Sequence, residues 1–142
     1  MTTHILAIMH TTPLDHARYI FYIASSGFIT GTIGLHLGKY LLGISSYLGS
    51  CVSMVYWYNP EHYSWRRFLD IVYVQYLMWI HIYTSYYTPV FYEYLLTQLI
   101  AVYCFILSWY YANLGLHTWA TIMHSVVHLI ANVSASILYL KL

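Results

Sequence analysis

Three histidines lie at helical spacing in an apolar stretch near the C-terminus, and two of them have the spacing of a metal site. The stretch "HTWATIMHSVVHLIAN" (117–132) contains His117, His124 and His128 and no Asp, Glu, Lys or Arg. On a helix, His124 and His128 at i and i+4 can bind one metal ion together. A catalytic zinc takes three protein ligands and a water. One hypothesis is therefore a zinc site on His124 and His128 with a third ligand from another helix.

His81 and Asp70 are the candidates for that third ligand because of their expected depth. At about 1.5 Å per helical residue, His81 lies roughly 19 Å and His128 roughly 16 Å from the same membrane edge. We therefore expect them to meet near the middle, with His124 at roughly 10 Å and Asp70 at roughly 3–5 Å. A zinc ion would turn its water into a hydroxide nucleophile, with Asp70 as the base or as a residue that orients a ligand.

Three other roles remain open for the histidines. His81 and His128 could be the axial ligands of a b-type haem. His117, His124, His128 and His81 could instead relay protons, as ionisable residues inside membranes often do. Alternatively, the imidazoles are neutral and hydrogen-bond Ser, Thr, Tyr or backbone carbonyls. The protein would then be a non-enzymatic structural or assembly subunit of a membrane complex.

The composition indicates that these residues are positioned by helices in a lipid bilayer. The 142 residues are 61% hydrophobic and 6% charged, whereas soluble domains are roughly 25% charged. Long uncharged segments separate the few charged residues, and a membrane crossing needs about 20 apolar residues. A formal net charge of +1 gives no indication of nucleic acid binding. The expected partners are the lipid bilayer and a lipid substrate, with membrane-protein partners or a homo-oligomer as further options.

We predict an all-α fold in which residues 1–142 form a single integral membrane domain, a polytopic transmembrane helix bundle. The expected spans are about 19–38, 40–58, 68–88, 90–112 and 117–140. A four-span alternative makes the glycine-rich first segment re-entrant. Lys and Arg favour a cytoplasmic N-terminus, because Arg18, Arg66 and Arg67 share one side against Lys39 and Lys141. The sequence does not indicate which membrane holds the protein.

Small residues on the first two predicted spans indicate a close helix contact. Helices in lipid pack through small and polar residues, since lipid removes the hydrophobic drive to associate. The two small faces comprise Gly27, Gly31, Gly34 and Gly38 on the first span and Ser45, Gly49 and Ser53 on the second. We expect these two faces to pack against each other.

Two segments resemble the motifs of the CREST superfamily, which contains alkaline ceramidases and the progestin and adipoQ receptors. They are "SMVYWYNPEHYSWRRFLD" and "HSVVH", and the likeness covers residues ~50–75 and ~117–140. The resemblance implies a bundle of seven helices with a zinc ion held by three histidines, and hydrolysis of a lipid amide or ester. Matched by position, it implies catalytic roles for Ser53 and Asp70 and zinc ligation by His124 and His128.

The chain departs from the family pattern in two respects. Trp57 stands where the family has a histidine on the second helix, which removes one zinc ligand. Five helices are predicted here, compared with seven in the family. Asp70 also has a structural interpretation, because Arg66 and Arg67 precede it at ion-pairing distance along a helix.

Overall fold

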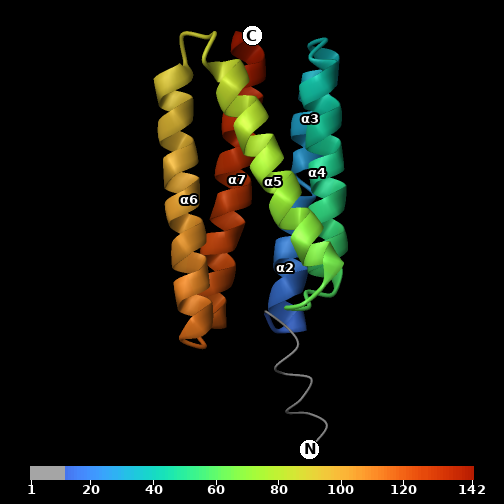
Figure 1. Ribbon diagram of the computed structural model, residues 1–142, viewed down its shortest axis with the longest axis vertical. Helices are drawn as coiled ribbons and strands as arrows, with labels where there is room; N and C mark the ends of the chain where they lie inside the picture. The colour runs from blue at the N-terminus through green and yellow to red at the C-terminus, as the bar shows by residue number, and fades with distance from the viewer. Residues whose placement is uncertain (1–11) are drawn as a thin grey trace, which may run out of the picture.

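The computed structural model describes residues 12–142, which form α-helices and no β-strand. The helices are α2 (Leu14–Ala24), α3 (Gly27–His36), α4 (Tyr40–Tyr58), α5 (Trp65–Ser85), α6 (Phe91–Asn113) and α7 (His117–Lys141). Helices α2 and α3 follow each other along one line, so together they form the first of the five passes along the bundle (Figure 1). The predicted all-α fold is confirmed.

The helical path over the first predicted span, about 19–38, starts five residues earlier than that span and is broken in the middle. The helical path begins at Leu14 and is interrupted between α2 and α3 at Ser25 and Ser26. There the backbone N–H groups of Ser25 and Ser26 bond the carbonyls of Tyr22 and Ile23, which tightens the last turn of α2. The Ser25 hydroxyl also donates to the Tyr22 carbonyl at 2.6 Å.

Two helix ends differ from the prediction because of local caps. Gly38, placed on the first helix by its spacing, lies beyond the end of α3 with a φ of 72°. This left-handed conformation, which glycine adopts easily, ends the helix. Helix α5 begins at Trp65 rather than at 68, because Ser64 caps it by accepting a hydrogen bond from the Arg67 backbone N–H. The predicted span 40–58 coincides with α4.

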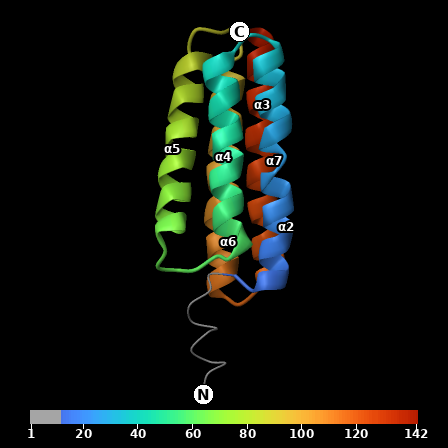
Figure 2. The same cartoon turned by 90° about the vertical axis from the view of Figure 1, so that its right-hand side faces the viewer.

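The helices pack around α4 and α7. Helix α4 contacts α2, α3 and α5, while α7 contacts α2, α3 and α6. Helix α6 runs alongside α7, and α5 leans away from α6 as it leaves the turn that joins them (Figure 1). The view in Figure 2 shows α5 and the α2–α3 pair on opposite sides of α4.

The glycine face of the first span packs closely against α4, but it does not meet the small face of Ser45, Gly49 and Ser53 that was predicted as its partner. A Cβ atom added to Gly34 would lie 2.9 Å from the Cα atom of Gly43, and one added to Gly27 would collide with the Ser50 hydroxyl. Sequence reasoning missed Gly43 as the partner of the α3 face. Gly49, expected to face α3, instead faces α5, where an added Cβ would collide with Leu77.

Polar side chains lie inside this bundle and large apolar ones lie outside. The buried polar residues are Thr12, Thr30, Ser45, Ser46, Ser50, Ser53, Asp70, His81, Ser85, Gln98, Ser108, Thr121 and Ser134. Exposed Phe, Trp, Tyr, Leu, Ile and Val side chains cover much of every described helix. Among the described helices, α6 and α7 are long and apolar enough to cross a membrane.

Candidate functional site

A cavity of about 510 Å³ lies within the bundle, between α4, α5, α6 and α7. Its lining includes all five candidate site residues, namely Ser53, Asp70, His81, His124 and His128. They come from three helices and were selected on separate grounds of spacing, depth and motif. The fold therefore brings the sequence-selected residues to one cavity.

Ser53 and Asp70 form a direct hydrogen bond between α4 and α5. The Ser53 hydroxyl donates to Asp70 Oδ1 at 2.5 Å, and both residues are buried. The alternative in which Asp70 pairs with an arginine is contradicted. Arg66 instead pairs with Glu61 at 3.3 Å, the ion pair found among the described residues.

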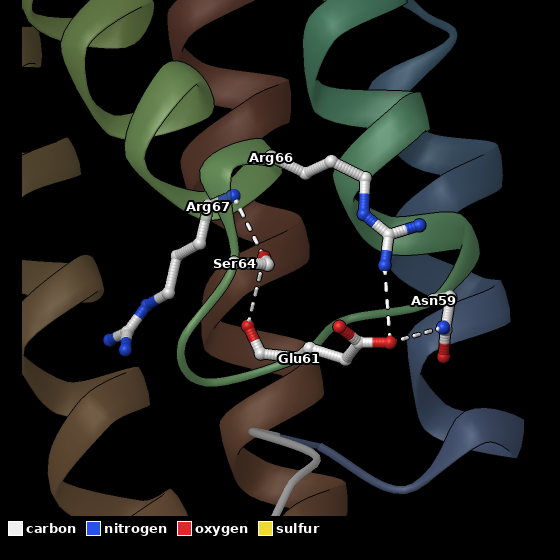
Figure 3. A network of polar contacts seen from close by, with 5 residues as sticks. All are labelled: Asn59, Glu61, Ser64, Arg66 and Arg67. Carbon is white, nitrogen blue, oxygen red and sulfur yellow. Dashed lines mark hydrogen bonds and ion pairs between the residues drawn. The ribbon is translucent and has the colours of Figure 1, made fainter.

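The charged side chains at the connection between α4 and α5 bond to other groups of the same segment (Figure 3). Glu61 Oε1 accepts a hydrogen bond from the Asn59 side-chain amide at 2.8 Å, and it is the same oxygen that pairs with Arg66. Arg67 donates to the His62 carbonyl at 3.0 Å. Since Arg66 pairs with Glu61 and Arg67 bonds His62, neither arginine pairs with Asp70, and the Asp70 carboxylate bonds Ser53 instead.

His124 and His128 lie beside each other on α7, as their spacing predicts. Their ring centroids are 5.3 Å apart. The His124 ring also packs edge-on against Trp57 at 4.7 Å and against Phe105 at 5.9 Å. Trp57, which stands where the CREST pattern has a histidine, thus contacts one of the two imidazoles. His128 Nε2 is buried and has no hydrogen-bond partner among the described residues.

His81 lines the same cavity but is bonded elsewhere. Its Nδ1 lies 2.7 Å from the Leu77 carbonyl and its Nε2 lies 2.6 Å from the Tyr139 hydroxyl. A carbonyl can only accept, so a neutral His81 carries its proton on Nδ1 and accepts from Tyr139 at Nε2. Both ring nitrogens are therefore engaged.

The depth estimate predicted that His81 meets His128, and the structure does not show this contact. His81 meets Tyr139, whose Cα lies eleven residues, or about 16 Å, beyond that of His128 along α7. Asp70, expected near the edge, reaches Ser53 inside the bundle. Two causes contribute: α5 starts three residues earlier than predicted, and its first turn lies farther along the bundle than the first turn of α7 (Figures 1 and 2). A residue count along straight parallel helices misses both.

The donors for a catalytic zinc are not assembled. Within residues 12–142, no three His, Cys, Asp or Glu side chains are grouped so that they could hold a metal ion. Two imidazoles on α7 leave one ligand short, and Trp57 occupies the neighbouring space. The haem hypothesis meets a similar obstacle, since His81 Nε2 is bonded to Tyr139.

His117 lies apart from the other histidines of α7. Its ring centroid is 6.1 Å from that of His16 on α2, and its Nδ1 is buried without a hydrogen-bond partner among the described residues. It does not line the cavity. A proton relay through His117, His124, His128 and His81 would therefore need links that the described side chains do not provide.

Three amide side chains that line the cavity, Gln75, Gln98 and Asn132, were not selected from the sequence as site residues. Gln98 of α6 donates to the Ser134 hydroxyl at 3.1 Å, and Asn132 of α7 donates to Ser26 at 2.6 Å. The sequence could have indicated them, because an amide in the middle of an apolar span needs hydrogen-bond partners inside the bundle.

No model of a known protein family, no curated protein and no solved structure matches this chain.

Proposed function

We propose that the chain is a multi-pass membrane protein that binds the polar group of a lipid amide or ester in its central cavity. One observation carries the proposal: a cavity with a few polar groups between mostly apolar walls lies in a helix bundle whose outer surface is rich in large apolar side chains. Soluble monomers rarely expose apolar patches larger than a few hundred Å². In lipid, by contrast, apolar side chains face outward and polar ones face the bundle interior.

The lengths of the five passes support a five-span arrangement. Helix α4 has 19 residues and α5 has 21, which corresponds to about 28 Å and about 32 Å. The hydrocarbon core of a bilayer is about 30 Å thick. Helix α2, which contains Arg18, and the α4–α5 connection lie at one end of the bundle, and the C-terminus lies at the other (Figure 1). We propose that the arginine end faces the cytoplasm, following the positive-inside rule.

The lining of the cavity suits an amphiphile with a hydrogen-bonding group. Val74, Leu77, Met78 and Phe105 give it apolar walls that can hold a hydrocarbon chain. The Ser53–Asp70 pair and the two imidazoles of α7 form its polar part. The unpartnered His128 Nε2 is costly, since an unsatisfied buried polar atom destabilises by about 1–3 kcal/mol. A bound amide or ester would hydrogen-bond the polar side chains that line the cavity.

The proposal is for binding rather than for hydrolysis. A serine nucleophile needs a neighbouring general base, usually an imidazole, and Ser53 is bonded to a carboxylate. A metal-bound hydroxide needs three protein ligands, and these are not grouped among residues 12–142. The CREST resemblance supports the lipid class of the ligand, because its serine and aspartate positions are the two that bond here.

Photo-crosslinking tests the proposal. A palmitoyl amide that carries a diazirine next to the amide should label peptides from α4, α5 and α7 in protein reconstituted in nanodiscs. Ala131→Phe fills the cavity from α7 and should reduce this labelling at least about fivefold, which corresponds to about 1 kcal/mol. Ala112→Phe is the control, since Ala112 is a half-buried alanine of α6 that does not line the cavity.

The outcome that would overturn the proposal is equal labelling of the two variants, or labelling confined to outward-facing side chains. The five-span arrangement is tested separately by reporters placed at the N-terminus and at the C-terminus. Opposite sides are expected, and reporters on the same side would contradict an odd number of spans between the N-terminal end and the C-terminus.

A further inference from the structure

A second hollow, of about 420 Å³, lies at the end of the bundle that carries the arginines. Helix α2 and the last turn of α4 form it, and its lining residues are Leu14, Arg18, Phe21, Tyr22, Trp57, Tyr58 and Asn59. Trp57 separates it from the central cavity, because its indole lines the hollow on one side and packs against His124 on the other.

Arg18 gives this hollow a positive charge that no carboxylate of residues 12–142 offsets in an ion pair. None of the described residues that line the hollow carries a carboxylate. Among the described residues, Arg66 is the arginine with an ion pair, and Arg67 bonds the backbone and ring of His62. Asp15, one turn before Arg18, is exposed and lies outside the lining. A guanidinium presents a planar set of donors that matches the oxygens of a phosphate group.

Trp57 adds a second polar group without a partner. Its side chain is 6% exposed, and its Nε1–H is buried with no acceptor among the described residues. A buried donor in this state costs about 1–3 kcal/mol. A ligand that carries both an anionic group and an apolar chain would pair with Arg18 and lie against the Trp57 side chain that lines the hollow.

The remaining walls are aromatic and aliphatic. Phe21 packs against Tyr22 and Tyr58, with ring centroids 5.5 and 6.3 Å apart. Leu14, Tyr22 and Tyr58 expose large parts of their surfaces beside the hollow. Tyr and Trp favour the level of lipid headgroups, and basic pockets between helices at the cytoplasmic side attract anionic lipids.

We infer that this hollow binds an anionic phospholipid, with the phosphate on Arg18 and the acyl chains along Trp57, Phe21 and Leu14. The inference rests on the proposed membrane location of the chain. It does not depend on the ligand of the central cavity.

Native mass spectrometry of the full chain in neutral detergent tests the site with two lipids of equal chain length, phosphatidylglycerol and phosphatidylcholine. The wild-type protein should retain phosphatidylglycerol over phosphatidylcholine at least about fivefold, which corresponds to about 1 kcal/mol. Arg18→Gln should remove this preference. Arg66→Gln carries the same change in charge at the same end, and it should keep the preference because Arg66 does not line the hollow.

A second pair of variants separates shape from charge. Leu14→Trp fills the hollow with every charge intact and should also remove the preference, while Leu140→Trp, at an exposed position near the other end, should not. An excess of inorganic phosphate should leave the lipid bound.

Equal losses in Arg18→Gln and Arg66→Gln would overturn the inference in favour of general charge attraction. No preference in the wild type, or displacement by inorganic phosphate, would overturn it too. Labelling of the central cavity by the palmitoyl amide probe should be unchanged in Arg18→Gln, so failure at one site is distinguishable from failure at the other.

Discussion

The contact between α3 and α4 and the space between α5 and α6 show two ways in which helices of one bundle can meet. In the first, glycines bring the backbones together, so that Gly34 and Gly43 leave no room for a methyl group. In the second, α5 leans away from α6, and the space between them and α7 contains the cavity with its polar residues (Figure 1). Close backbone approach holds α3 against α4, whereas α5 and α6 touch little and border the hollow, with α6 packed along α7.

This difference indicates where the protein tolerates change. A close backbone contact is intolerant of added volume, since neighbouring backbone atoms cannot rotate away. Side chains around a cavity can accept volume, but they cannot lose a hydrogen-bond partner without cost. Substitutions in the two regions should therefore differ in both size and kind of effect.

The largest effect is expected from Gly34→Leu in the close contact. The new side chain would meet the backbone of Gly43 and the ring of Tyr139. It should destabilise the protein by about 3 kcal/mol or more, at the upper end for overpacking. Thermal unfolding in detergent measures the change, and Ile29→Leu at an exposed position of α3 is the control. Similar unfolding temperatures for the two variants would show that α3 and α4 are not in close contact.

A smaller effect is expected from Tyr139→Phe beside the cavity. The lost hydroxyl lies 2.6 Å from His81 Nε2 and 2.8 Å from the Ser46 hydroxyl. Leaving these buried groups unpaired should cost about 2 kcal/mol. The same unfolding assay applies. Tyr110→Phe, at an exposed position on α6, should change stability by less than about 0.5 kcal/mol. If Tyr139→Phe is as silent as this control, the hydrogen-bonded description of the second region is wrong.

The smallest effect is expected from adding zinc to the purified protein. With two imidazoles of α7 and no grouped third donor among residues 12–142, zinc should stabilise the fold by less than about 1 kcal/mol. A tight site with zinc at a thousand times its Kd would give about 4 kcal/mol. The exposed His36 provides the control substitution, His36→Ala.

A large zinc effect that disappears in His124→Ala and His128→Ala but persists in His36→Ala would restore the zinc hypothesis. Its further loss in His81→Ala or in Asp70→Asn would then identify the third ligand. That result would also mean that the cavity rearranges around the metal, since His81 is now bonded to Tyr139 and Asp70 to Ser53.

The sequence by itself determined the helices and the faces that they bury. Uncharged segments of membrane length, separated by Pro60, Pro89 and the Asn113–Gly115 turn, predicted four of the five passes to within a few residues at each end. The i, i+4 spacing of His124 and His128 placed their rings together, because helical geometry fixes neighbours on one face. These are local properties, set by the backbone of a single helix.

Only the tertiary structure decided which helix face meets which. The early start of α5 at Trp65 and the place of its first turn, farther along the bundle than that of α7, brought Asp70 to Ser53 and His81 to Tyr139 (Figures 1 and 2). The same packing placed Gly43, rather than Gly49, against α3. Tilt and rotation of a helix are set by contacts with several neighbours at once, and no residue count along one helix contains them. Hence the sequence selected five residues that line one cavity, and it did not predict which side chains they bond.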